Sequence, residues 1–305
     1  MIIRRTFLAA TAAAAAVVAF GVNAQAADWR AKYPTITLGV ITSENESDRL
    51  QRYKPVRAYL EKKLGVQIKW RSATDYAGII EGVKAKKIEL AYLGPASYSK
   101  AWLVTKGQVT PIVGALDKKG AFGYNAVVVV KKDSPFQKIE DLKGKRFGFA
   151  DPNSTSGHQA PRYFLTEAKF NPDDFFGSVT FSGSHENSVM GLMNGTFDGV
   201  ATWYRSEERS NMTRMAGKKM IEDGSWRVIW KSPKLPSSPW TIPAWLPEEM
   251  KVDLKQALLD MKDEDAAAWK GLTDGKSAGY KEVTHKDYEA IVRMIKHNLR
   301  TRKSS

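Results

Sequence analysis

Short apolar segments alternate with amphipathic segments along most of this 305-residue chain, and the alternation limits the fold more than any other feature. The apolar segments are rich in Val, Ile and Leu, as buried strands are, whereas the others carry apolar residues at helical spacing. Repeated strand–helix–strand units with short connections require a mostly parallel sheet whose faces are covered by helices. The sequence therefore predicts an α/β fold.

The alternation is interrupted once and then begins again, which indicates two lobes of similar size. The first block has predicted strands at 36–41, 66–70 and 88–93, with helices at 52–64 and 75–84. The second block has predicted strands at 145–150, 178–182 and 197–202, with helices at 155–168 and 186–194. The remaining predicted elements are strands at 109–116, 124–130 and 226–230, and helices at 247–262, 264–271 and 285–299.

The segment 147–165 combines the end of a strand, a tight turn and the start of a helix. Ser154, Thr155 and Ser156 place three hydroxyls on the first helical turn, and Gly157 follows them. Unpaired N–H groups at a helix N-terminus carry the positive end of the helix dipole and favour an anion. A helix cap at Ser154 alone is the simpler explanation, but three consecutive hydroxyls favour a bound ligand. The G-x-x-x-x-G-K-(S/T) pattern is missing, so this is not a nucleotide P-loop.

Polar residues also follow other predicted strands at their carboxyl ends, which is where open α/β sheets bind ligands. Each cluster alone has an ordinary helix-cap explanation, whereas their shared placement predicts a cleft between the two lobes. The clusters contain Tyr76, the segment Gly94 to Ser97, Ser184 with His185, and Thr202 to Tyr204.

Residues 1–26 have the composition of a cleavable signal peptide. Arg4 and Arg5 form a charged region, an Ala/Val-rich apolar run follows, and Ala24-Gln25-Ala26 is a small-x-small cleavage signal. We therefore expect export to the periplasm. Two adjacent arginines are found in twin-arginine signals and also in ordinary secretory signals, so the twin-arginine and Sec routes both remain open.

Composition narrows the class of ligand and of chemistry. The formal net charge of +14 suits an acidic ligand, an anionic membrane face or nucleic acid. The lysines are spread along the chain rather than clustered, and the chain is expected to be exported, so we expect no nucleic-acid partner. Cysteine is absent, which excludes a thiol catalyst and a thiolate metal site.

The residue patterns of an enzyme or a metal site are missing. The four histidines, His158, His185, His285 and His297, show no H-x-x-x-H spacing, and there is no G-x-S-x-G elbow. His185 and Glu186 are adjacent, but neighbouring residues do not face each other on a helix. We therefore expect a binding protein without catalytic residues, metal or cofactor.

Five segments of the chain resemble the periplasmic phosphonate/phosphite/phosphate-binding proteins of ABC importers, the phosphonate-binding (PhnD-like) family. They are 75–80, 123–124, 151–157, 183–187 and 228–233, and the Asp-Pro-Asn-Ser-Thr-Ser-Gly sequence at 151–157 is the most specific. The resemblance implies a type II periplasmic binding fold, in which two lobes joined by crossing strands close on a ligand in the cleft between them. Lobe 1 is then expected to comprise 27–117 and 225–305, and lobe 2 to comprise 118–224.

The resemblance also implies which residues bind the ligand. Six residues are expected to hold the phosphonate or phosphate oxygens: Tyr76, Tyr124, Ser154, Thr155, Ser156 and His185. Members that bind aminoethylphosphonate hold its amine with two further carboxylates, and the corresponding positions here fall near Ser206 or Glu207 and at Ser238. Because serine cannot neutralise an ammonium, the phosphonate or phosphate head group is the better-supported ligand. Trp203, Tyr204 and Trp240 are candidates for an aromatic wall around the rest of the ligand, with ordinary lobe packing as the alternative.

The predicted function is capture of a phosphorus oxyanion or organophosphonate by a monomer that delivers it to an ABC permease and its ATPase. An exported receptor that feeds a membrane sensor kinase is the alternative, because its fold and site would be the same. An exported phosphohydrolase ranks last, given the missing catalytic patterns.

Overall fold

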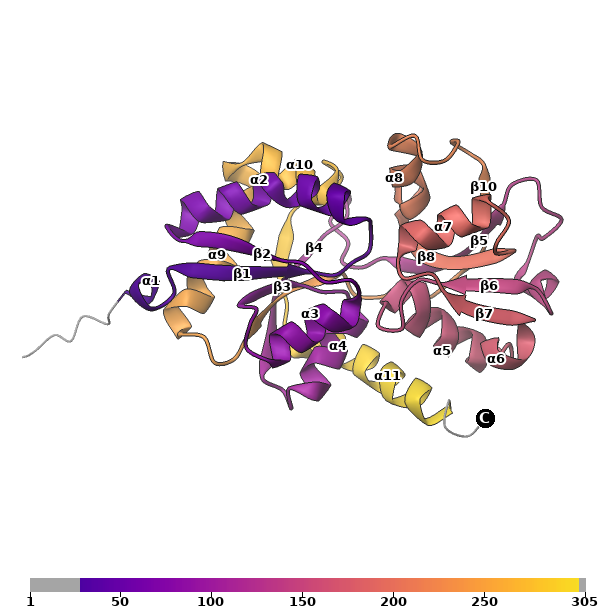
Figure 1. Ribbon diagram of the computed structural model, residues 1–305, viewed down its shortest axis with the longest axis horizontal. Coiled ribbons are helices and arrows are strands. Elements are labelled where there is room, and N and C mark those ends of the chain that lie inside the picture. The colour runs from indigo at the N-terminus through magenta and orange to yellow at the C-terminus, as the bar shows by residue number, and fades with distance from the viewer. Residues whose placement is uncertain (1–27, 302–305) are drawn as a thin grey trace, which may run out of the picture.

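The computed structural model describes residues 28–301 and arranges them in two α/β lobes (Figure 1). The predicted signal peptide, residues 1–26, lies outside the described residues. Within 28–301, no helix is long and apolar enough to cross a membrane.

Lobe 1 is built on a six-stranded sheet with the strand order β12-β4-β11-β3-β1-β2. β1 runs parallel to β2 and β3, whereas β11 is antiparallel to β3 and β4, and β12 is antiparallel to β4. The strands are β1 (Thr35–Val40), β2 (Gln67–Arg71), β3 (Leu90–Tyr92), β4 (Val109–Ala115), β11 (Pro239–Pro243) and β12 (Tyr280–Glu282).

Helices cover both faces of this sheet, and each helix packs its apolar residues against it. α2 (Glu46–Leu64), α9 (Glu248–Glu264) and α10 (Ala266–Thr273) pack on one face, together with Trp29 of the short α1 (Trp29–Lys32). α3 (Tyr76–Lys84) and α4 (Pro95–Val104) pack on the other. Figure 1 shows α2 and α10 above the sheet and α3 and α4 below it.

Lobe 2 has the strand order β10-β5-β8-β6-β7, with β9 paired to β8. Alternate valines of β5 enter opposite cores: Val128 and Val130 face α5, whereas Val127 and Val129 face α7 and α8. The strands are β5 (Asn125–Lys131), β6 (Arg146–Phe149), β7 (Ser178–Phe181), β8 (Gly199–Ser206), β9 (Arg209–Ser210) and β10 (Trp226–Lys231). The helical segments are η1 (Ile139–Leu142), η2 (Thr155–Gln159), α5 (Ala160–Glu167), α6 (Pro172–Phe175), α7 (His185–Met193) and α8 (Asn211–Gly217).

The chain crosses between the lobes at 116–124 and at 232–238, and the two crossings are paired. Tyr124 N donates to Leu235 O over 2.9 Å, and Leu235 N donates back to Tyr124 O over 2.8 Å. Gly123 has φ of +126°, and a Cβ at this position would lie 2.6 Å from Leu235 O. The crossings therefore form a compact hinge in which position 123 requires glycine.

The C-terminal helix α11 (Glu289–Thr301) follows the short η3 (His285–Tyr288) and touches both lobes. Ile291, Met294 and Ile295 pack with the hinge residues Tyr124 and Leu235. Figure 1 shows α11 running beneath α4 of lobe 1 toward α5 of lobe 2. The helix is thus a third connection between the lobes, beside the hinge.

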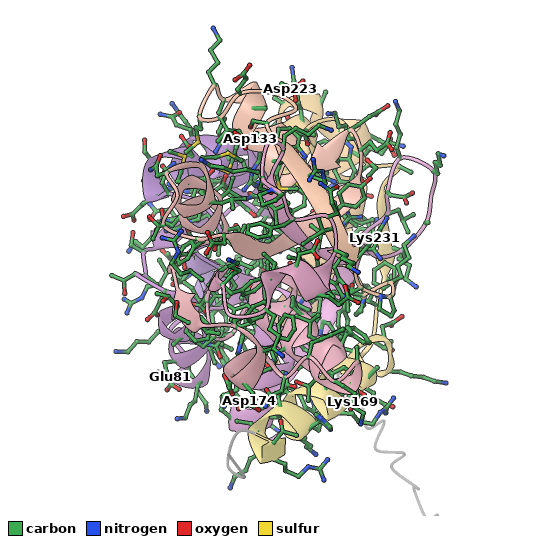
Figure 2. The ribbon with its side chains drawn as sticks, turned by 90° about the vertical axis from the view of Figure 1, so that its right-hand side faces the viewer. Glu81, Asp133, Lys169, Asp174, Asp223 and Lys231 are labelled. Carbon is green, nitrogen blue, oxygen red and sulfur yellow. The ribbon has the colours of Figure 1, made fainter. Side chains whose placement is uncertain are left out.

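The exposed charges of lobe 2 are of both signs. Lys169 and Lys231 are exposed at the same end of the molecule as Asp133, Asp174 and Asp223 (Figure 2).

The structure confirms the predicted α/β class and two lobes, but it corrects one lobe boundary. A boundary between 224 and 225 assigns β10 to lobe 1, whereas β10 pairs with β5 in the sheet of lobe 2. Lobe 2 therefore extends to the second crossing. The sequence also failed to predict α4 and β11, both of which belong to lobe 1.

Candidate functional site

A cavity of about 100 Å³ lies between the lobes and is lined by residues of both. The six residues predicted to hold the oxyanion all line it: Tyr76, Tyr124, Ser154, Thr155, Ser156 and His185. Tyr76 comes from lobe 1, Tyr124 from the hinge, and the other four from lobe 2. No Asp or Glu is among the described residues that line this cavity.

The floor of the cavity is the turn that joins β6 to α5, which we call the cradle (Ser154–Gly157). Ser154 Oγ accepts a hydrogen bond from Gly157 N over 3.1 Å and so caps the π-helical turn η2. Within the part of the chain that the structure describes, the N–H groups of Thr155 and Ser156 have no acceptor. These two donors and the neighbouring hydroxyls are therefore available to an anion.

His185 orients the cradle as a neutral imidazole. Its Nε2 lies 3.0 Å from Ser154 Oγ, and its Nδ1 lies 3.0 Å from Thr202 Oγ1. Burial, with a further contribution from the nearby Arg214 cation, lowers the pKa of His185 to about 3. The ring is therefore uncharged at neutral pH, and it holds the Ser154 hydroxyl without contributing a charge that titrates near pH 7.

The two tyrosines act as neutral donors. Burial raises the pKa of Tyr76 far above its ordinary value, and it raises the pKa of Tyr124 to about 12. Both phenols therefore keep their protons at neutral pH and can donate to a ligand oxygen.

The cradle also contacts lobe 1 directly. Thr155 Oγ1 accepts a hydrogen bond from Ala96 N, at the start of α4, over 2.8 Å. Ser97 Oγ donates to Asn153 O over 3.0 Å. Because these contacts join the lobes across the cavity, the structure represents a closed arrangement.

Four arginines that the sequence analysis did not single out line the same cavity. Arg52 comes from α2, Arg205 from β8, Arg209 from β9 and Arg214 from α8. They lie inside elements or at a strand turn, and they follow no local motif. The positive net charge was the only sign of them in the sequence.

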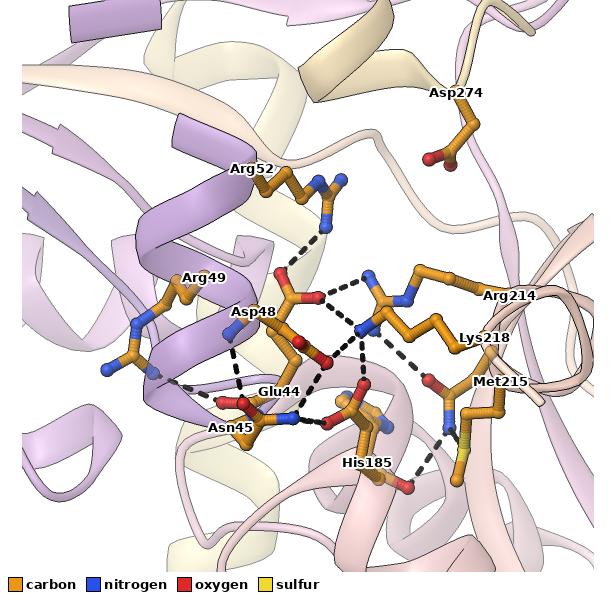
Figure 3. Close-up of polar contacts among 12 residues, drawn as sticks. Glu44, Asn45, Asp48, Arg49, Arg52, His185, Arg214, Met215, Lys218 and Asp274 are labelled. Atoms are coloured by element: carbon orange, nitrogen blue, oxygen red, sulfur yellow. Dashed lines mark hydrogen bonds and ion pairs between the residues drawn. The ribbon is translucent and has the colours of Figure 1, made fainter. Parts of the chain in front are cut away.

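A cluster of ion pairs that includes Arg52 and Arg214 joins the lobes, and we call it the latch (Figure 3). Its other members are Lys218, Glu44, Asp48 and Glu186. Lys218 Nζ, at the end of α8, lies 2.7 Å from Asp48 Oδ2 and 3.3 Å from Glu44 Oε2 in lobe 1. The same ammonium lies 2.8 Å from Glu186 Oε1 in lobe 2. Burial alone would raise the pKa of Glu44, but Arg52, Arg214 and Lys218 outweigh it and lower the pKa to about 2.

Some of the residues predicted to form an aromatic wall, or to occupy the positions of the amine ligands, line the cavity and others do not. Trp203 and Ser238 line it, whereas Tyr204, Glu207 and Trp240 do not. Trp240 is completely buried in lobe 1 and donates to the Tyr280 hydroxyl over 2.8 Å. Lys231 Nζ lies 4.5 Å from the centre of the Tyr204 ring, and Glu207 is exposed. In the part of the chain described, no group of His, Asp and Glu is arranged to hold a metal ion.

Two α/β lobes, a paired hinge and a cavity between them with hydroxyls and guanidinium groups in its lining define a two-lobed periplasmic binding protein of type II. The chain belongs to the family described as "ABC transporter, phosphonate, periplasmic substrate-binding protein", whose model matches residues 38–288. This confirms the family predicted from the five segments. It is a family of substrate-binding proteins of ABC transporters rather than of enzymes.

Two curated relatives carry similar names. The chain is 35% identical over 209 residues to the "Phosphonates-binding periplasmic protein" of Escherichia coli, a match that covers 67% of this chain and 59% of that protein. It is 29% identical over 273 residues to the "Phosphate-import protein PhnD" of Mycolicibacterium smegmatis, with 84% of each chain covered.

Solved structures agree on the fold. A binding protein component of an ABC phosphonate transporter from Pseudomonas aeruginosa has a TM-score of 0.77 at 27% identity, covering 88% of this chain and 87% of that one. A Prochlorococcus marinus protein in complex with methylphosphonate has a TM-score of 0.73 at 22% identity, covering 86% and 97%.

Proposed function

We propose that this protein captures a phosphonate, phosphite or phosphate oxyanion in the periplasm and delivers it to an ABC permease and its ATPase. The observation that most supports this proposal is the composition of the cavity lining. It offers hydroxyls, free N–H groups and guanidinium groups, and its described residues include no carboxylate. Such a donor set suits a tetrahedral oxyanion, because every ligand oxygen accepts and none meets a repelling acid.

In this proposal the cradle holds the head group. The N–H groups of Thr155 and Ser156 and their hydroxyls donate to the oxygens from lobe 2. Tyr76 and Tyr124 donate from the lobe 1 side and from the hinge. His185 keeps the Ser154 hydroxyl in place through its 3.0 Å contact. Because the donors come from both sides, a bound anion stabilises the closed arrangement.

Delivery to a permease requires export, which we assign to residues 1–26 as a cleavable signal peptide read by the Sec or the twin-arginine route. The protein acts in this proposal as a monomer without a nucleic-acid partner. The description of the family and the name of the Escherichia coli relative support a periplasmic location, and the name of the Mycolicibacterium smegmatis relative supports import.

Calorimetry of the chain without residues 1–26 tests the proposal against methylphosphonate, phosphite and phosphate, with arginine and a sugar as controls. We expect at least one of the three oxyanions to bind with a Kd in the micromolar range or below, and neither control to bind. Binding of arginine or the sugar alone, with no response to the three oxyanions, would show that the proposal is wrong.

The substitution Thr155→Ala separates ligand binding from helix capping. It removes a hydroxyl donor to a charged oxygen, a bond worth about 1.5–3 kcal/mol, so affinity is expected to fall about tenfold to a hundredfold. The ligand-free protein should lose at most about 1–2 kcal/mol of stability, because Ser154 remains as the cap and only the hydrogen bond from Ala96 N is lost.

Thr273→Ala is the matched control, because it removes another buried threonine hydroxyl, in α10, outside the cavity lining. It should leave affinity unchanged. Lost stability with intact affinity in Thr155→Ala would mean that Thr155 is only structural.

A further inference from the structure

The described lining of the cavity carries far more positive charge than a single head group needs. Four guanidinium groups face a space of about 100 Å³ that no Asp or Glu lines. Unpaired buried charges are costly, so such a surplus persists where a ligand supplies the counter-charge. The four cations differ in whether a protein group already balances their charge.

Two of the arginines belong to the latch (Figure 3). Arg52 Nη1 lies 2.9 Å from Glu44 Oε1, and Arg214 Nη1 lies 3.5 Å from Glu44 Oε2. With Lys218, this cluster contains three cations, and Glu44, Asp48 and Glu186 supply three anions. The latch is therefore balanced without a ligand.

Arg205 is not balanced. It donates only to Ala115 O and Ser237 Oγ, both at 3.3 Å, and it forms no ion pair with any described residue. Burial lowers the pKa of its guanidinium, because removing a cation from water without pairing it with an anion disfavours the charged form.

Arg209 is only partly balanced. Its Nε lies 3.4 Å from Asp274 Oδ2, an acid whose side chain is 37% exposed, whereas the Arg209 side chain is only 11% exposed. Nε and Nη1 are buried and have no hydrogen-bond acceptor among the described residues. Burial, and then repulsion from Arg205, lower the pKa of Arg209 to about 10. Of these two neighbouring cations, only Arg209 pairs with an acid among the described residues, and that acid is partly solvated.

Arg205 and Arg209 line the same cavity as the cradle, and neither has its charge balanced by a buried acid among the described residues. An ammonium there would meet cations, whereas a carboxylate or phosphoryl group would receive bidentate hydrogen bonds.

We propose that the physiological ligand carries a second anionic group beside its phosphonate or phosphate head, and that Arg205 and Arg209 bind this second group. The ligand class is a short phosphoryl compound with a second oxyanion, such as a phosphonocarboxylate or a bisphosphonate. The inference rests on the proposed function, because the cradle must hold the first head group.

Three ligands that share one carbon chain test the charge of the second group. Ethylphosphonate ends in a methyl, aminoethylphosphonate in an ammonium and 3-phosphonopropionate in a carboxylate. Calorimetry should show 3-phosphonopropionate binding at least about tenfold more tightly than ethylphosphonate, as expected for charge-assisted hydrogen bonds. Aminoethylphosphonate should bind more weakly than ethylphosphonate. Methylenediphosphonate, measured alongside, distinguishes a second phosphoryl group from a carboxylate.

Variants of the two arginines then locate the second group. In Arg205→Met, and independently in Arg209→Met, the preference for 3-phosphonopropionate over ethylphosphonate should fall to less than about threefold. Thr155→Ala is the matched control, because it should weaken both ligands by the same factor and leave their ratio unchanged. Melting curves of each variant establish that it is folded. If Arg205→Met fails to fold because it loses its contacts with the hinge, Arg209→Met still tests the inference.

The outcomes separate this inference from the proposed function. If ethylphosphonate and 3-phosphonopropionate bind equally well, the second-anion inference is wrong while oxyanion binding stands. If both arginine variants weaken the two ligands by the same factor, the arginines neutralise the head group itself, and the inference is again wrong. If no phosphonate, phosphite or phosphate binds to the unmodified protein, the proposed function itself fails.

Discussion

Replacing Gly157 by alanine is expected to reduce oxyanion affinity by at least about a hundredfold and to destabilise the protein by about 1–3 kcal/mol. A Cβ at this position would lie 2.5 Å from Ala150 Cβ and 2.8 Å from Ser154 Oγ. His185 Cε1 would also lie 2.8 Å away, so neither side of the turn can yield without moving the cradle. Several donors to the ligand would shift together, which is why the expected effect exceeds that of Thr155→Ala.

Calorimetry and thermal melting of the Gly157→Ala protein measure the two effects separately. Gly217→Ala is the matched control, because no atom lies within 4 Å of its added Cβ and its backbone is not left-handed. This control should retain affinity and stability. An alanine at 157 that binds methylphosphonate as the unmodified protein does would refute the proposed position of the anion.

Replacing Glu44 by glutamine is expected to destabilise the protein by about 3 kcal/mol at pH 7. The substitution keeps the shape of the side chain but removes the anion that Arg52, Arg214 and Lys218 share. Glu44 is only 3% exposed, so solvent screens the three cations poorly once the carboxylate is gone. Urea unfolding of both proteins measures the difference.

The effect should disappear in acid. The folded protein lowers the pKa of Glu44 from 4.5 to about 2, so its stabilisation is fully present above pH 4.5 and is lost as the pH falls toward 2. The difference between the two proteins should therefore shrink over this range. Glu81→Gln is the control, since Glu81 is exposed and pairs only with Lys84 on the surface. A difference that stays constant from pH 7 to pH 3 would contradict the assigned ion pairs.

The local part of the site was predictable from sequence because it is built from local geometry. Strand, turn and helix N-terminus follow one another at 147–165, so the three hydroxyls and the free N–H groups could be placed together. Tyr76 and His185 follow the ends of other strands and converge on the same cavity for the same reason. Tyr124 was expected only from the family resemblance, since it precedes a strand and lies at the hinge.

The arginines were not predictable because nothing local distinguishes them from surface residues. Arg52 lies within a long helix, and Arg205 and Arg209 flank a strand turn. Each reaches the cavity only through the packing of its lobe and the closure of the two lobes. A long flexible cation in such a segment is usually solvated, so only the tertiary structure identifies these four.

The wrong lobe boundary and the open assignment of Trp240 have a similar cause. Trp240 lies in β11, whose five residues are all buried, so no alternation indicated whether its ring meets the ligand or packs in the core. β10 was assigned to the wrong lobe because its residues are half-buried or exposed, without the alternation that would tie it to a core. In both cases the neighbouring strand decides the outcome, and that strand is distant in sequence.

The position of α11 determines where the two lobes can separate. Its packing on Tyr124 and Leu235 fixes it to the axis of rotation, so a small rotation moves nearby atoms little and distant atoms most. The most distant edge is the one where α2 faces α8, on the side of the molecule opposite α11 (Figure 1). The latch lies on that edge, so a rotation about the hinge would separate Lys218 from Asp48 and Glu44 by more than it separates atoms beside α11. Of the distances between the lobes, the one between α2 and α8 is therefore expected to change most when the lobes open.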